Sequence, residues 1–320
     1  METMSSSSSG PETPPHPRPH NPGGHRKPRP AVLAVGLAAA VFVGACGVDD
    51  DEGPPATEVS ATAEDAPEAM SSYSRYVALG DSFAAFGPTD APTSGPQACQ
   101  RSTRNYPAVL AEDPRVGELV DVTCGGARTR DLASPQHTET PPQFDALTPD
   151  TDLVTLSIGG NDIGFGSIAG CVIRATTSDT GADCRSQLEE TVTAELDRLG
   201  ERLDEVYDGI RERSPGARIV TTGYLPLVPD HGGCDFTTGM SSGDVTWTRH
   251  VMDRIETIVD AAADRAGAEV VLPDDAADRH ACAPADERYT DFTGVETGSH
   301  PMHPTAAGQQ ATARAVADVL

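Results

Sequence analysis

Five short runs of β-branched and other apolar residues, separated by stretches of helical periodicity, constrain the fold of this chain most strongly. The apolar runs are residues 75–79, 118–123, 152–157, 218–222 and 268–272. The helical stretches, with apolar residues three or four apart, are residues 106–111, 188–213, 245–266 and 304–320. Strands that alternate with helices form a parallel sheet covered on both faces. We therefore predict one three-layer α/β domain over residues 73–320, with about five parallel strands.

The first 45 residues do not fit this alternation and have the layout of an export signal. A basic cluster at residues 25–29 precedes an uncharged apolar run, residues 31–45, which is shorter than the roughly 20 residues of a spanning helix. The run ends in Val43-Gly44-Ala45-Cys46, which resembles the lipobox of bacterial lipoproteins. We expect a lipoprotein-type signal peptide over residues 1–45, with Cys46 lipidated on the extracellular face of the membrane. An ordinary secretory signal or a short membrane anchor are the alternatives.

Residues 46–72 are acidic, rich in Ala, Pro, Thr and Ser, and without hydrophobic periodicity, which predicts a disordered tether. The whole chain has a formal charge of -26, from 49 acidic and 23 basic residues. Because so acidic a surface repels phosphate backbones, we expect no nucleic-acid partner. We expect a monomer that contacts the membrane only through its N-terminal lipid.

The cysteine count agrees with export. Besides Cys46, an even number remains: Cys99, Cys124, Cys171, Cys184, Cys234 and Cys282. In an oxidising compartment, three disulfides are the natural interpretation, although six cysteines allow 15 pairings. Because the chain lacks the closely spaced cysteine and histidine pairs of zinc sites, we expect no metal and no other cofactor.

The first predicted strand runs directly into Gly80-Asp81-Ser82-Phe83. In an open parallel sheet, ligands bind at the carboxyl ends of the strands. Ser82 is therefore placed as a nucleophile would be, although an Asp-Ser pair is also common in simple turns.

Two further strand ends carry hydrogen-bond donors. Cys124-Gly125-Gly126-Ala127 follows the second predicted strand, and Gly159-Gly160-Asn161-Asp162 follows the third. Backbone N–H groups and an Asn side chain that converge on one point are what a developing oxyanion requires. Each block taken alone is equally compatible with an ordinary turn.

His303 lies in a loop before the last predicted helix, from which an imidazole can reach a neighbouring strand end. It is a candidate general base, and a solvated loop histidine is the alternative. A metal site at His300 and His303 would need further ligands. The segment 239–243 matches the GxSxG elbow of other hydrolases, but it lacks the apolar strand that this motif requires.

In this order and at these spacings, the blocks resemble the SGNH/GDSL hydrolase superfamily and look most like its secreted actinobacterial lipases and esterases. Gly80-Asp81-Ser82-Phe83 is similar to the first block with Phe in place of Leu, and Gly126 falls at the second-block glycine. Gly159-Gly160-Asn161-Asp162 and His303-Pro304 are similar to the remaining two blocks. The resemblance covers residues 73–320 and implies the flavodoxin-like SGNH hydrolase fold.

The resemblance also implies roles for individual residues. Ser82 would be the nucleophile and His303 the base, while the Ser82 N–H, the Gly126 N–H and the Asn161 side chain would form the oxyanion hole. Disulfides in these relatives join sequential cysteines, which implies Cys99–Cys124, Cys171–Cys184 and Cys234–Cys282.

The group that orients His303 departs from the family pattern. Many members carry an Asp three residues before the histidine, where this chain has His300, and Thr305 replaces an Asn that often follows His-Pro. Some secreted relatives use a backbone carbonyl, so we expect the main-chain oxygen of His300 to accept the Nδ1–H bond of His303. The alternative is a carboxylate from elsewhere, of which the nearest in sequence are Asp274, Asp275, Asp286 and Asp291.

The sequence thus predicts an exported serine esterase or lipase that hydrolyses carboxylic esters of small molecules or lipids through an acyl-enzyme on Ser82. We expect loops at residues 84–99 and 230–244 to set the acyl selectivity, which leaves lipase, phospholipase and carbohydrate deacetylase open. The alternative from a different class is a catalytically silent envelope-binding lipoprotein that keeps the hydrolase fold.

Overall fold

The computed structural model of the protein describes residues 72–177 and 183–320. The expected signal peptide, Cys46 and residues 46–71 of the expected tether lie outside the described residues. Within the described ranges, no helix is long and apolar enough to cross a membrane.

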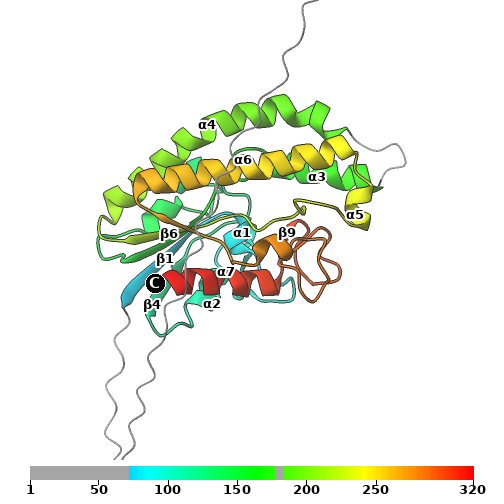
Figure 1. The fold of residues 1–320 in the computed structure, drawn as a ribbon. Helices are drawn as coiled ribbons and strands as arrows, with labels where there is room; N and C mark the ends of the chain where they lie inside the picture. Colours follow the sequence, from blue (N-terminus) through cyan, green and yellow to red (C-terminus); the bar gives the residue numbers. More distant parts are fainter. Residues whose placement is uncertain (1–71, 178–182) are drawn as a thin grey trace, which may run out of the picture. The chain divides into compact units, whose positions relative to one another are not determined.

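Five parallel strands form the central sheet in the order β4-β1-β5-β6-β7 (Figure 1). They are β1 (Tyr73–Gly80), β4 (Val116–Asp121), β5 (Leu153–Ser157), β6 (Arg218–Thr222) and β7 (Glu269–Val271). Two short antiparallel pairs lie outside this sheet: β2 (Thr93–Ser94) with β3 (Arg101–Ser102), and β8 (Thr290–Asp291) with β9 (His303–Pro304). The predicted parallel sheet is therefore confirmed.

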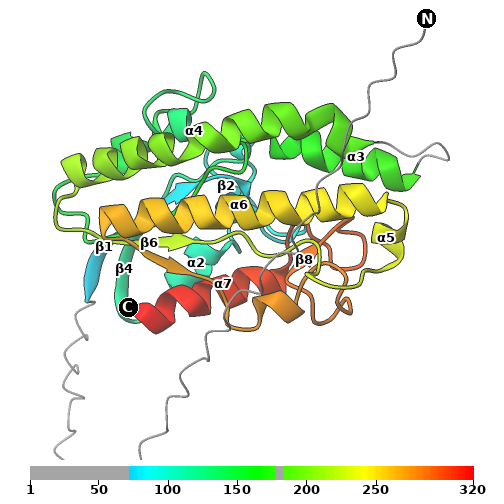
Figure 2. The same ribbon diagram turned by 45° about the horizontal axis from the view of Figure 1, so that its top comes forward.

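Helices cover both faces of the sheet (Figures 1 and 2). They are α1 (Ser82–Ala85), α2 (Tyr106–Leu110), α3 (Phe165–Thr177), α4 (Cys184–Arg213), α5 (Asp235–Thr238), α6 (Ser242–Ala266) and α7 (Ala306–Val319). Successive side chains of a strand point to opposite faces, so Leu79 and Val154 pack with α4 and α6, whereas Ala78 and Leu153 pack with α2 and α7. The three-layer α/β prediction is confirmed.

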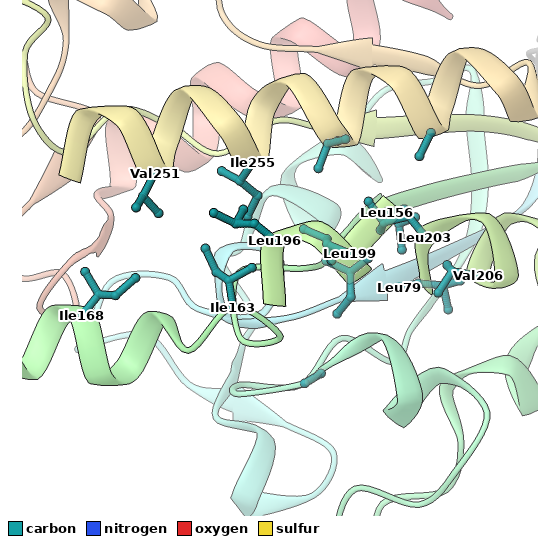
Figure 3. Close-up of a cluster of buried hydrophobic side chains, with 14 of the residues drawn as sticks. Leu79, Leu156, Ile163, Ile168, Leu196, Leu199, Leu203, Val206, Val251 and Ile255 are labelled. Atoms are coloured by element: carbon teal, nitrogen blue, oxygen red, sulfur yellow. The ribbon is translucent and has the colours of Figure 1, made fainter. Parts of the chain in front are cut away.

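Helix α3 was not predicted from the sequence. Glycines at 166 and 170 lower its intrinsic helix propensity and interrupt its apolar pattern. Its buried face nevertheless packs into the main core through Ile168 and Val172. Figure 3 shows Ile168 pointing from α3 towards the space below Val251 of α6.

Three disulfides connect segments that surround the sheet: Cys99–Cys124, Cys171–Cys184 and Cys234–Cys282. This is the sequential pairing that the family resemblance implies. The bond from Cys171 to Cys184 joins α3 to the first residue of α4. Each closed loop is expected to add about 2 to 4 kcal/mol to stability by restricting the unfolded chain.

Candidate active site

The nucleophile candidate, Ser82, is the first residue of α1 and is separated from the end of β1 only by Asp81. Gly80 turns the chain there with φ +143°, and a Cβ at this position would lie 2.4 Å from the carbonyl oxygen of Ser157. Asp81 caps the short helix by accepting the backbone N–H of Phe83 at 3.0 Å. The tight turn leaves Ser82 only 5% exposed at the carboxyl edge of the sheet.

A buried glutamine holds this turn in place. The Oε1 of Gln143 accepts the Gly80 N–H at 2.8 Å, and its Nε2 donates to the Gly80 carbonyl at 2.9 Å. The same carbonyl accepts the N–H of Cys124 at 3.0 Å, from the segment after β4. The sequence gives no signal for Gln143, because this residue lies in a separate short 3₁₀ turn (Gln143–Ala146) with no motif around it.

His303 and Ser82 are in direct contact. The His303 Nε2 lies 2.8 Å from the Ser82 Oγ, and its Nδ1 lies 2.6 Å from the carbonyl oxygen of Pro301. Because a carbonyl can only accept, Nδ1 carries the hydrogen, and the lone pair of Nε2 faces the serine. Burial, with a smaller contribution from His300, lowers the pKa of His303 to about 4 although the Pro301 carbonyl opposes the shift. The imidazole is therefore neutral at pH 7 and able to accept a proton.

The orienting carbonyl belongs to Pro301 and not to His300, which corrects the sequence-based expectation. The His300 carbonyl instead accepts the backbone N–H of His303 at 3.2 Å, so it closes the turn that carries the histidine. Within this turn Met302 has φ +61°. The His300 ring packs on Phe86 with 4.3 Å between centroids, and its side chain has no hydrogen bond to His303.

None of the four carboxylates considered from the sequence bonds to His303. Asp291 is buried and accepts the N–H groups of Thr293 and Gly294. Asp275 accepts the Tyr289 hydroxyl, while Asp274 and Asp286 are exposed at the surface.

The expected oxyanion-hole segments meet at the same edge of the sheet. Asn161 donates through Nδ2 to the Ala127 carbonyl at 3.0 Å, which leaves its second N–H free. In the described ranges, the N–H groups of Ser82 and Gly126 donate to no protein acceptor. Asp162 accepts the N–H and the hydroxyl of Thr129, at 3.0 and 2.6 Å, and so ties the glycine-rich loop to the Asn161 segment.

A second residue missed from the sequence bridges the nucleophile and the Asn161 segment. The Tyr224 hydroxyl, just beyond β6, donates to Asp81 Oδ2 at 2.6 Å and accepts the Gly160 N–H at 2.7 Å. Burial raises the pKa of Asp81 to about 7 and that of Tyr224 well above its ordinary value. A lone tyrosine after a strand has no spacing signal that would have revealed this bridge.

Two further features considered from the sequence are the GxSxG-like segment at residues 239–243 and a possible metal site. Ser241 of the GxSxG segment caps α6 by accepting the Asp244 N–H at 3.0 Å, far along the chain from any sheet strand. Among the described residues, no group of three His, Cys, Asp or Glu side chains has the arrangement of a metal site.

The sequence profile of the GDSL-like Lipase/Acylhydrolase family matches residues 78–311, which span the nucleophile turn, the glycine loop, the Asn161 segment and His303. The chain belongs to this family. It is a carboxylic ester hydrolase. Lipase 2 of Streptomyces coelicolor is 33% identical over 302 residues, covering 92% of this chain and 99% of the relative.

Solved structures of this family share the fold. The extracellular lipase of Streptomyces rimosus superposes with a TM-score of 0.62 at 25% identity, over 77% of this chain and 100% of the relative. Phospholipase A1 of Streptomyces albidoflavus superposes with a TM-score of 0.60 at 28% identity, over 77% of this chain and 99% of the relative.

Proposed function

We propose that this GDSL-family enzyme is an exported serine esterase that cleaves acyl esters through an acyl-enzyme on Ser82. The observation that carries the proposal is the pair of contacts of His303, 2.8 Å to Ser82 Oγ and 2.6 Å to the Pro301 carbonyl. A neutral imidazole held in this tautomer is a general base for the serine hydroxyl.

In the proposed reaction, Ser82 Oγ attacks the ester carbonyl while His303 Nε2 takes its proton. Charge on the carbonyl oxygen would be stabilised by the free N–H groups of Ser82, Gly126 and Asn161. His303 then returns the proton to the departing alcohol oxygen as the carbon–oxygen bond breaks. Water, deprotonated by His303, attacks the acyl-enzyme, and His303 then passes that proton to Ser82 Oγ as the acid is released.

A fluorophosphonate probe tests this assignment. We expect stoichiometric labelling of Ser82, identified by peptide mass, and loss of labelling and of ester hydrolysis in Ser82→Ala. Ser241→Ala is the matched control, because that serine also lies in a GxSxG-like segment but serves as a helix cap. Labelling that persists in Ser82→Ala would place the nucleophile elsewhere, whereas an unreactive wild type with intact fold would favour the catalytically silent envelope-binding lipoprotein.

We further propose that the protein is exported, with its first 45 residues as a signal peptide, residues 46–72 as a tether and Cys46 as the lipid anchor. The basic and apolar segments, the three disulfides and the extracellular location stated for the Streptomyces rimosus lipase support export. The mass of the mature N-terminus from native membranes tests the anchor. A chain that begins elsewhere than Cys46, or carries no acyl mass there, contradicts it.

A further inference from the structure

An apolar cavity of about 50 Å³ lies between α3 and α6, beside the candidate active site. Residues from six stretches of the chain line it, among them Phe83, Ile168, Val251, Met252, Phe292 and Met302. Figure 3 shows Ile168 of α3 and Val251 and Ile255 of α6 pointing into the space between these helices. The loops at residues 84–99 and 230–244, which were expected to set acyl selectivity, contribute no lining residue.

Neither Ser82 nor His303 lines the cavity, but residues next to them in the chain do. Phe83, one wall residue, follows Ser82 directly, and its ring centroid lies 5.4 Å from that of His303. Phe165, another wall residue, lies 5.9 Å from the same imidazole. Met302 precedes His303 in the chain and is held by its N–H bond to the Asp291 carbonyl, at 2.7 Å. An acyl group attached to Ser82 therefore has an apolar space within reach.

No polar side-chain group in the wall is free to bind a ligand. The Thr248 hydroxyl donates to the Asp244 carbonyl at 2.8 Å, and the Tyr224 hydroxyl is shared between Asp81 and Gly160. A polar atom placed in this cavity would lose its water without gaining a partner, which is costly. The cavity therefore fits unsubstituted hydrocarbon and disfavours acyl groups with oxygen atoms along the chain.

We infer that this cavity receives the acyl chain of the substrate and selects short, unsubstituted acyl groups, propionyl to butyryl. The inference rests on the proposed role of Ser82. A cavity of about 150 Å³ holds the six carbons of benzene, so a cavity of 50 Å³ holds about two carbons. These are the two carbons beyond the carbonyl of a propionyl group, or the two beyond the first methylene of a butyryl group.

Met252 limits the length of the chain. Together with Tyr224, Val228 and Ile255, it lines both this cavity and a neighbouring one of about 300 Å³. We expect removal of its side chain to join the two spaces, and two methyl groups added at Ala169, which also lines the acyl cavity, to fill most of it.

The test measures kcat/KM for nitrophenyl acetate, butyrate and octanoate. In the wild type we expect the butyrate to exceed the octanoate at least about tenfold, since one unaccommodated methylene already costs 10- to 200-fold. Met252→Ala should raise the octanoate-to-butyrate ratio about tenfold or more, and Ala169→Val should raise the acetate-to-butyrate ratio. Met240→Ala is the matched control, because Met240 is buried but lines neither cavity.

A second comparison tests the hydrocarbon requirement. The methoxyacetyl ester has the length of the butyryl ester with one methylene replaced by oxygen. After correction for their alkaline hydrolysis rates, we expect it to react at least tenfold more slowly than the butyrate. Equal corrected rates would overturn this part of the inference.

Failure of the cavity assignment is distinguishable from failure of the proposed function. If fluorophosphonates with ethyl, butyl and octyl chains all label Ser82 at the same rate, and neither variant changes the ester ratios, the cavity assignment is wrong while Ser82 remains the nucleophile. If no probe labels Ser82, the proposed function falls and the cavity assignment with it.

Discussion

The two halves of the candidate active site are held in different ways. Ser82 follows β1, an inner strand of the central sheet, where Gly80 is bonded to Gln143 and to the segment after β4. His303 lies on the two-residue strand β9, which pairs with Thr290 and Asp291 of β8 outside the central sheet. The nucleophile is thus part of the global fold, whereas the position of the base depends on local turns.

This difference explains how each half responds to change. On the nucleophile side, each oxyanion-hole donor lies in a segment that follows a strand of the central sheet. We therefore expect the loss of one donor to lower kcat without displacing the segments that carry the others. On the base side, the orienting group is a main-chain carbonyl, so no side-chain substitution removes it. The following predictions test this contrast, beginning with the largest effect.

Asn161→Ala removes one donor from the nucleophile side. We expect kcat to fall about 10²- to 10³-fold, because an oxyanion donor acts mainly in the transition state. KM should stay within a small factor if it follows binding. Asn105→Ala is the control: this fully buried Asn caps α2 and should lower Tm with little change in kcat. An unchanged kcat with a raised KM would reassign Asn161 to substrate binding.

Tyr224→Phe removes the hydroxyl that joins Asp81 to Gly160. We expect a loss of about tenfold in kcat, because the N–H of Gly160 and the carboxyl of Asp81 lose a buried partner on either side of the reacting serine. Tyr207→Phe is the control, because it removes a buried tyrosine hydroxyl that bonds to Thr221 at 2.7 Å. We expect this variant to lower Tm without changing kcat.

A double variant separates positioning from simple destabilisation. If Tyr224 acts by placing the Asn161 segment, Tyr224→Phe should have a smaller effect on kcat in the Asn161→Ala background than in the wild type. Fully multiplicative effects would show that the two residues act independently.

The pH profile tests the base side. Burial lowers the pKa of His303 to about 4, and only the neutral imidazole accepts the serine proton. Activity should therefore persist below pH 6 and decline about tenfold per pH unit once the pH falls below about 4, over the range where the fold survives. An acid limb near pH 6.5 in kcat/KM would show that His303 is solvated in the free enzyme.

We expect the smallest effects on kcat from substitutions of the side chains once considered as partners of His303. Replacing His300, Asp274, Asp275 or Asp286 by Ala should change kcat by no more than about twofold to threefold, because the Pro301 carbonyl orients the ring. Asp291→Ala should lower Tm more than the others, since it leaves two loop N–H groups without their acceptor. A thousandfold loss of kcat in any one of these variants, with the fold intact, would identify a third catalytic member.

The sequence predicts the nucleophile side of the site better than the base side. The strands before Gly80 and Asn161 have clear β-branched patterns, and parallel strands end at one edge, so the nucleophile side follows from local rules. The sequence places the carbonyl acceptor of His303 one residue too early, because the backbone turn over residues 300–303 leaves no trace in side-chain chemistry. Gln143 and Tyr224 were missed because their partners lie more than 60 positions away, and α3 was hidden by its glycines.

The geometry of Gly80 has a consequence for mutational tolerance. Every other amino acid would place a Cβ 2.4 Å from the main-chain oxygen of Ser157, which belongs to the neighbouring strand and cannot swing aside like a side chain. No codon change away from glycine is therefore neutral at this position. Gly126 also has a positive φ, but the nearest atom to an added Cβ is 3.6 Å away and belongs to the flexible Gln136 side chain. In a saturation library selected for ester hydrolysis, position 80 should retain glycine alone, whereas position 126 should also retain Asn, which tolerates this backbone region.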